Sequence, residues 1–395
     1  MIFSGWMLWR DDVAVPGPAR ADGVGSRPPT DTTGGAAAPA TWVQGTWEVR
    51  DGRVERLHGP AAGIRADLTG WALPGLVDVH CHIGIGSSGP AGPEEQERQA
   101  VADRDSGVLA VRDCGVPVDN SWVQDRGDLP LLVRAGRHVA RPRRYIRDLA
   151  VEVKDPGLLP AELARQARAG DGWVKIVADW IDRSGGADSD LEPLWPRDVL
   201  VDAVAAAHAE GARVAAHCFS HTAVDDLIEA GVDDIEHGTG MDDDQLAEAA
   251  ARGVTVTPTL LQVELFADFA DRAGHRYPRY GATMRAMHRG RRDHAERLFA
   301  SGVHVLPGTD SGGYQEHGTI ASEFALWRAV GVEPARILDL ATWRARDTLG
   351  LESLLPGACA DLVVLGEDPR QDLSTLAHPR AVVLRGVRVA AGAEH

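Results

Sequence analysis

The chain has 395 residues, a formal net charge of −17 at pH 7, and 44% hydrophobic and 25% charged residues. This composition is that of an ordinary globular protein, and the length suits one large enzyme domain with a smaller one attached. Because nucleic acids and anionic membranes attract basic surfaces, the negative charge argues against both as partners. The sequence has no run of about 20 apolar residues and no secretory signal at its start, so we expect a cytoplasmic protein.

Both ends of the chain carry short apolar segments that are typical of β-strands. These segments are Ile2–Val15, Thr41–Arg50, Arg53–His58, Ala360–Leu365 and Ala381–Val389. The dipeptide Asp51-Gly52 predicts a hairpin turn. The run Pro16–Ala40 is rich in Gly, Pro and Ala, which predicts a low-complexity surface loop. We therefore expect residues 1–72 and 355–395 to form one small β-sandwich domain.

The centre of the chain alternates strand-like segments with helix-like segments that are long enough for crossover connections. The eight strand candidates are Leu73–His82, Val108–Cys114, Leu131–His138, Trp173–Trp180, Arg213–Phe219, Asp234–Gly238, Val254–Leu261 and Val303–Asp310. Eight strand–helix repeats predict an α/β fold, a TIM-like (β/α)8 barrel over residues 73–354. The active site of such a barrel lies at the carboxyl ends of its strands.

Side chains able to bind a metal stand at the carboxyl ends of several of these strands. His80 and His82 close the first strand and, being two residues apart, face the same side, so both imidazoles can share one ion. His217, His237 and Asp310 close the fifth, sixth and eighth strands. A single histidine in such a place is more often a hydrogen-bonded structural residue. Four histidines and an aspartate at one rim indicate a metal site.

Lysine is rare in this chain, because Lys154 and Lys175 are the only lysines among the 41 basic residues. Lys175 lies within an apolar strand, where a charged amine is costly unless it is paired or neutral. Its side chain could simply extend to solvent. Alternatively, a buried amine with a depressed pKa can react with carbon dioxide, and the resulting carbamate could bridge two cations. Arginine cannot do this, because it stays protonated.

Four segments resemble motifs of the amidohydrolase superfamily. Leu73–His82 is similar to its strand-one motif, and Ile235–Thr239 is similar to its strand-six motif. Gly308–Gly312 resembles the strand-eight motif, and Pro356–Leu365 resembles the return of the chain to the small β domain. The motifs occur in order and with suitable spacing over most of the chain. The chain is most similar to imidazolonepropionase-like and Xaa-Pro dipeptidase-like amidohydrolases.

This resemblance implies a binuclear centre with two divalent ions, for which zinc suits the ligand types. The implied ligands are His80, His82 and Asp310 for one ion, His217 and His237 for the other, and carboxylated Lys175 with a hydroxide bridging both. Carbon dioxide would thus enter as a carbamate. Asp310 would act as the general acid and base in hydrolysis of a C–N bond in a small amide, dipeptide-like or cyclic amide substrate.

Two departures from family patterns bear on the reaction. Deaminase branches carry glutamate three residues after the strand-five histidine, whereas Ser220 stands there in this chain, which argues against a deaminase. Dipeptidase-like relatives often carry tyrosine where Phe219 stands. Two alternatives stay open. One is hydrolysis of an ester, lactone or organophosphate bond at the same site, and the other is a catalytically silent metal-binding scaffold.

Loops that follow the strands are expected to contact the substrate. The candidates are His138, Arg144, Trp180, Tyr314 and His317. Arginine can bind a carboxylate through two hydrogen bonds, although a solvated basic face would explain the same residues. The expected partner is a small-molecule substrate. Relatives are often oligomers, so a homo-oligomer is a further expectation.

Overall fold

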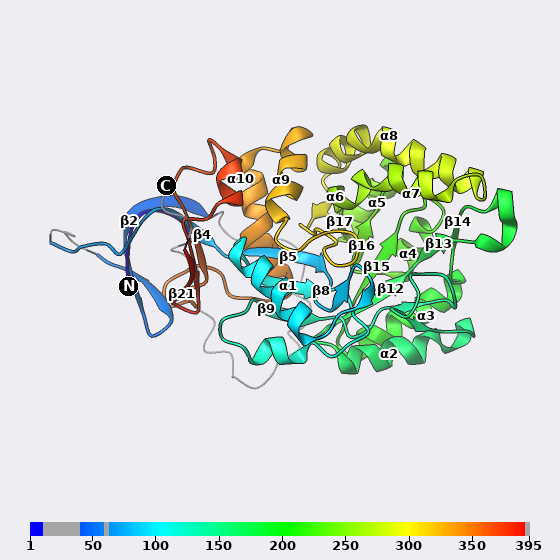
Figure 1. Ribbon diagram of the computed structural model, residues 1–395, viewed down its shortest axis with the longest axis horizontal. Coiled ribbons are helices and arrows are strands. Elements are labelled where there is room, and N and C mark those ends of the chain that lie inside the picture. Colours follow the sequence, from blue (N-terminus) through cyan, green and yellow to red (C-terminus); the bar gives the residue numbers. More distant parts are fainter. Residues whose placement is uncertain (11–39, 59–62, 392–395) are drawn as a thin grey trace.

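The computed structural model of the protein describes all residues except 11–39, 59–62 and 392–395. A sheet built from both ends of the chain lies at one end of the molecule, beside a larger α/β body (Figure 1). The predicted loop Pro16–Ala40 falls almost entirely outside the described residues. Within the described part of the chain, no helix is both long and apolar enough to cross a lipid bilayer.

The strands of the two chain ends share one sheet, in the order β21-β20-β19-β4-β1-β2-β3. They are β1 (Ile2–Trp9), β2 (Thr41–Arg50), β3 (Arg53–Arg56), β4 (Leu68–Pro74), β19 (Leu362–Leu365), β20 (Ala381–Leu384) and β21 (Val387–Ala391). Asp51 and Gly52 form the tight β2–β3 turn with φ angles of +50° and +75°. Positive φ at both central residues is the geometry that Asp-Gly favours in hairpins.

The α/β body is built on parallel strands in two hydrogen-bonded groups. The first group is β5 (Leu76–Cys81), β8 (Val108–Asp113) and β9 (Leu131–Arg134). The second is β11 (Val151–Glu152), β10 (Val139–Ala140), β12 (Trp173–Val177), β15 (Arg213–Cys218), β16 (Asp234–His237), β17 (Thr255–Thr257) and β18 (His304–Val305). The expected first strand Leu73–His82 is divided at Gly75, because Leu73 and Pro74 belong to β4 in the terminal sheet.

Backbone contacts connect the two groups of parallel strands. The Val79 N–H donates to Pro307 O at 2.8 Å, and the Asp310 N–H donates to His80 O at 2.7 Å, so β5 lies beside the segment after β18. On the other side, β10 follows β9 closely in the chain and pairs with β12. The arrangement is a TIM-barrel-like α/β fold. It places the carboxyl ends of β5, β15 and β16 together with the segment after β18.

Helices separate the strands and cover the outside of the body (Figure 1). They are α1 (Pro93–Asp105), α2 (Leu159–Ala169), α3 (Arg197–Ala209), α4 (Val224–Ala230), α5 (Asp243–Arg252), α6 (Leu260–Glu264), α7 (Phe266–Ala273), α8 (Pro278–Ala300), α9 (Ile320–Ala329), α10 (Pro334–Asp339) and α11 (Ala345–Leu349). The ends of α5 are determined by its capping residues. Asp242 and Gln245 form a reciprocal capping box at its start, and Gly253 ends it in the left-handed conformation.

Candidate metal centre

His80, His82 and Asp310 meet where β5 ends beside the segment that follows β18. His80 Nε2 lies 3.0 Å and His82 Nε2 lies 3.4 Å from Asp310 Oδ1. The three side chains form a group compact enough to hold one metal ion. His82 Nδ1 lies 3.2 Å from the carbonyl oxygen of Gly115. A hydrogen bond from the far nitrogen of a histidine to a backbone carbonyl is the usual way in which a metal-binding ring is oriented.

His217 and His237 form a second pair beside this group. His217 Nδ1 lies 3.0 Å from His237 Nε2, and the rings of His80 and His237 are 5.1 Å apart between centroids. The opposite nitrogen of His237, Nδ1, lies 2.7 Å from Thr259 Oγ1. His217 Nε2 lies 3.7 Å from Asp179 Oδ1. The five side chains that the sequence placed at strand ends are thus brought together.

Lys175 lies in β12, which pairs with the strand of His217, and forms a buried ion pair with Glu236 Oε2. Glu236 Oε1 also accepts a hydrogen bond from Cys114 Sγ at 3.0 Å and lies 3.3 Å from Arg112 Nη2. Burial alone would lower the pKa of Lys175, but the neighbouring acidic groups, Glu236 first among them, together outweigh burial and raise the pKa. The depressed pKa expected for Lys175 is therefore wrong, because the sequence interpretation did not include this carboxylate.

The protonation states of the cluster fit a cation. Burial lowers the pKa of His217 well below its usual value, and it lowers the pKa of His237 to about 3. Burial opposes ionisation of Asp310, but the neighbouring histidines, His80 first among them, together outweigh burial and hold the pKa of the carboxyl well below its usual range. Neutral imidazole and ionised carboxylate are the forms that bind zinc. His80 Nδ1 and His217 Nε2 are also buried without a hydrogen-bond partner among the described residues.

Aromatic side chains surround His217. Its ring centroid lies 5.7 Å from that of Tyr145, 5.5 Å from that of Trp180 and 4.3 Å from that of Phe219. His138 stacks edge-on against Tyr145 at 4.9 Å. Its Nδ1 lies 2.9 Å from Gly115 O, whereas its buried Nε2 has no hydrogen-bond partner within the described chain. Since burial lowers the pKa of His138 to about 3, this nitrogen can accept a hydrogen bond from a ligand.

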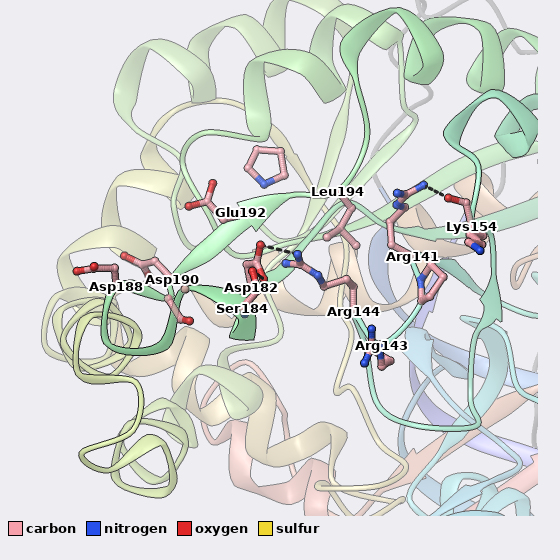
Figure 2. Close-up of a pocket in the computed structure, with 14 residues that line it drawn as sticks. Arg141, Arg143, Arg144, Lys154, Asp182, Ser184, Asp188, Asp190, Glu192 and Leu194 are labelled. Atoms are coloured by element: carbon pink, nitrogen blue, oxygen red, sulfur yellow. Dashed lines mark hydrogen bonds and ion pairs between the residues drawn. The ribbon is translucent and has the colours of Figure 1, made fainter.

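Arg144, which directly precedes Tyr145 in the chain, lies in a charged groove (Figure 2). The groove has a volume of about 570 Å³, and its basic side chains are Arg141, Arg143, Arg144 and Lys154. Arg144 Nη2 pairs with Asp182 Oδ2 at 2.5 Å. Because Arg144 precedes Tyr145 and Asp182 directly follows the short strand β13 (Asp179–Ile181) that carries Trp180, this ion pair connects the two segments that place aromatic rings against His217.

The structure places Tyr314 and His317 farther from the histidines. Tyr314 is 50% exposed, and its ring packs against Phe269 at 5.3 Å. His317 Nδ1 lies 2.8 Å from Asp103 Oδ2, and this contact holds the ring beside α1. The described contacts of these two side chains involve none of the five clustered residues. A role for either of them in substrate binding stays a prediction.

Two residues of the site, Glu236 and Thr259, were missed by the sequence interpretation. A signal for Glu236 was present, because Asp234 and Glu236 lie two apart in a short strand-like segment that follows an apolar-flanked turn and therefore share one face of a buried strand. Two buried carboxylates need cationic partners, and Arg112 and Lys175 lie in apolar strands. Thr259 carried no comparable signal, since its contact to His237 depends on a left-handed backbone.

Known proteins resemble the chain in sequence and in fold. The model of the amidohydrolase family matches residues 71–389. An uncharacterised protein of Mycobacterium tuberculosis (strain ATCC 25618 / H37Rv) is 48% identical over 337 residues, which cover 85% of this chain and 90% of that protein. A Xaa-Pro dipeptidase with bound methionine in its active site is 23% identical with a TM-score of 0.74, covering 87% of this chain and 94% of that one. A prolidase complexed with N-methylphosphonate-L-proline is 23% identical with a TM-score of 0.73, covering 89% and 96%.

Proposed function

Since the chain belongs to the amidohydrolase family, whose members hydrolyse carbon–nitrogen bonds, we propose that it is a binuclear metal-dependent hydrolase of a small amide, dipeptide-like or cyclic amide substrate. One observation carries this proposal. His80, His82 and Asp310 form a compact group, and the ring of His237, which lies against His217, is 5.1 Å from that of His80. A structural role would not require five such side chains at one rim.

The proposal includes a closed eight-stranded barrel over residues 73–354 and a terminal β-sandwich from residues 1–72 and 355–395. Within the barrel, His80, His82 and Asp310 would hold one zinc ion, and His217 and His237 would hold the other. Lys175, as a carbamate, would bridge the two ions. If its amine stays uncarboxylated and paired with Glu236, a mononuclear centre at His80, His82 and Asp310 is the alternative.

When bound, two divalent ions lower the pKa of a water between them and polarise the carbonyl of the scissile bond. Asp310 would transfer the proton as general base and then as general acid. Its Oδ1 lies next to His80 and His82, so it would accept the proton of the attacking water and pass it to the leaving nitrogen. Because the side chain of Asp310 is 14% exposed, whereas those of His80 and His82 are almost fully buried, it is the ligand that faces an incoming substrate.

The walls of the site suggest how a substrate would be held. His138 Nε2 is a buried acceptor beside Tyr145, and Trp180 lies against the same tyrosine at 4.8 Å. A ring or apolar side chain of the substrate would pack on these aromatic faces. Arg144 would bind a substrate carboxylate from the adjoining groove, in exchange for its contact with Asp182. Tyr314 and His317 remain candidates at the outer rim.

Metal analysis combined with a substrate panel tests the proposal. Purified protein, prepared with zinc and bicarbonate, should contain about two zinc ions per chain and hydrolyse at least one member of a panel of Xaa-Pro dipeptides, N-acyl amino acids and cyclic amides. His217→Asn should lower kcat/KM at least about 100-fold, whereas His275→Asn, at an exposed position, should leave it unchanged. Absence of bound divalent metal together with full activity of the His217 variant would refute the proposal. Turnover of esters or lactones alone would instead favour the alternative chemistry on the same site.

The bridging carbamate has its own test. High-resolution electron density of protein prepared with bicarbonate should show extra atoms on Lys175 Nζ. Lys175→Arg should lose the second zinc ion, because arginine stays protonated and cannot form the carbamate. Density for a bare amine, with a single zinc ion bound, would favour the mononuclear alternative.

A further inference from the structure

A buried carboxylate outside the metal cluster fixes the start of a short helix. Glu323 lies on α9 with none of its surface exposed. Its Oε1 accepts hydrogen bonds from the Leu260 N–H and from Trp327 Nε1, both at 2.8 Å, and its Oε2 accepts one from the Leu261 N–H at 2.8 Å. Leu260 and Leu261 form the first turn of α6, whose N–H groups have no partners within the helix. Glu323 therefore holds this turn in place.

Thr259 immediately precedes the two residues that Glu323 binds. It is fully buried, and its backbone is left-handed, with φ +43° and ψ +58°. A β-branched residue in this conformation is strained, by about 1–3 kcal/mol, and persists only where the surroundings impose it. The hydrogen bonds that the next two N–H groups donate to Glu323 supply that constraint. The strain is thus located beside a proposed ligand.

The strained backbone directs the Thr259 hydroxyl to the metal cluster. Thr259 Oγ1 lies 2.7 Å from His237 Nδ1, and His237 itself has a φ angle of +67°. With Nδ1 bound to the hydroxyl, the ring presents Nε2 towards His217 Nδ1, 3.0 Å away. Partners of this kind set both the tautomer and the direction of a metal-binding histidine.

We propose that Thr259 and Glu323 are positioning residues that orient His237 for the zinc ion shared with His217. The inference rests on the proposed binuclear function and deepens it. Glu323 imposes the left-handed turn, and Thr259 converts that turn into a hydrogen bond on His237. We call the contacts from Glu323 through Thr259 to His237 the relay. The His80, His82 and Asp310 group has no contact of this kind with Thr259 or Glu323, so breaking the relay should weaken the binding of one zinc ion and not of the other.

Zinc affinity measured ion by ion tests the relay in the full-length protein. Thr259→Val keeps the shape and the β-branch but removes the hydroxyl, and Thr259→Ser restores the hydroxyl. With a competing chelator, the Val variant should bind the weaker zinc ion about 10–100-fold less tightly, with the tighter ion unchanged. The Ser variant should stay within about threefold of wild type. Absorption spectra of the Co²⁺-loaded proteins should change for the Val variant and not for the Ser variant.

Glu323→Gln tests the upstream half of the relay. Its amide nitrogen would face a backbone N–H, so one of the two contacts to α6 is lost and the weaker ion should again be released more readily. Glu264→Gln, at the other end of α6 and 38% exposed on its side chain, is the matched control and should bind zinc as wild type does. Thermal melting identifies any variant that fails to fold. The zinc affinities of the folded variants then test the relay.

The outcomes separate the relay from the proposed function. Two zinc ions in wild type, with unchanged affinities in folded Thr259→Val and Glu323→Gln, would overturn the relay and leave the binuclear hydrolase intact. Equal weakening of both ions would also overturn it, because that result indicates general destabilisation. Absence of zinc from the wild-type protein would refute the proposed function itself.

Discussion

Replacing Arg112 with methionine should destabilise the protein strongly, although the guanidinium contacts no proposed substrate. Arg112 has no exposed surface, pairs with Asp234 and Glu236, and donates from Nε to Val79 O at 2.6 Å. Its guanidinium also stacks on the ring of Trp173 at 4.3 Å. Methionine has similar length and fills the space, so the change removes charge and hydrogen bonds rather than volume.

The magnitude follows from the two carboxylates that the substitution would leave behind. Removing one partner of a buried ion pair costs about 3–5 kcal/mol, because the remaining charge is not solvated. Asp234 would keep hydrogen bonds from the Thr255 and Thr257 hydroxyls, and Glu236 would keep Lys175, so total loss of the fold is not expected. With an unfolding entropy of roughly 2 cal/mol/K per residue, this cost corresponds to a fall of about 4–6 °C in Tm.

Calorimetry at fixed metal loading measures the effect, with Arg252→Met as the control. Arg252 pairs with Glu248 on the surface, where the two side chains are 52% and 50% exposed, and its loss should cost less than about 1 kcal/mol. Adding Asp234→Asn to the Arg112 variant should recover part of the stability, since it removes one of the two buried carboxylate charges that lost their arginine partner. Equal Tm values for the Arg112 and Arg252 variants would refute the reasoning.

Three further outcomes are expected. Burial raises the pKa of Glu323 from 4.5 to about 7, so between these two pH values the folded state retains a proton that the unfolded state releases. The free energy of unfolding should therefore fall by on the order of 3 kcal/mol as the pH rises from about 4.5 to about 7. Glu323→Gln should reduce this dependence of stability on pH in denaturant titrations. Chelation should lower Tm, because zinc at a thousand times its Kd contributes about 4 kcal/mol; identical melting with and without chelator would exclude a tightly bound ion. Arg144→Leu should raise KM for carboxylate-bearing substrates, leaving kcat and the KM of neutral analogues unchanged, whereas equal effects on both substrate types would argue against a carboxylate contact.

Strand periodicity and motif spacing were sufficient to predict the grouping of His80, His82, His217, His237 and Asp310. A residue at the carboxyl end of a parallel strand is positioned by the sheet, whatever its neighbours are. Most strand ends were therefore placed within a few residues, but β18 ends at Val305, five residues before the predicted end at Asp310. The division of Leu73–His82 at Gly75 was not predicted, because the pairing of β4 with β1 and β19 depends on segments distant in sequence.

The interactions that the sequence did not reveal depend on pairs of elements. Lys175 was recognised as unusual, but its partner Glu236 lies on another strand, and strand neighbours in space cannot be read from one segment. The ion pair of Arg144 with Asp182 joins two loops whose paths follow no periodic pattern. The bond of Thr259 to His237 requires a backbone angle that amino-acid preferences oppose.

The position of β4 also affects how the chain is made. β4 lies between β1 and β19, so one of its edges has no partner until residues 362–365 have been synthesised. β5, which carries His80, is separated from the end of β4 by Gly75 alone. β5 can pair with β8 early, but its other neighbour, the segment after β18, and the second partner of β4 are made only late in synthesis. Pairings this distant in sequence form slowly and leave apolar strands exposed meanwhile. Heterologous production should consequently benefit from slower translation and from chaperones more than that of a protein whose termini fold separately.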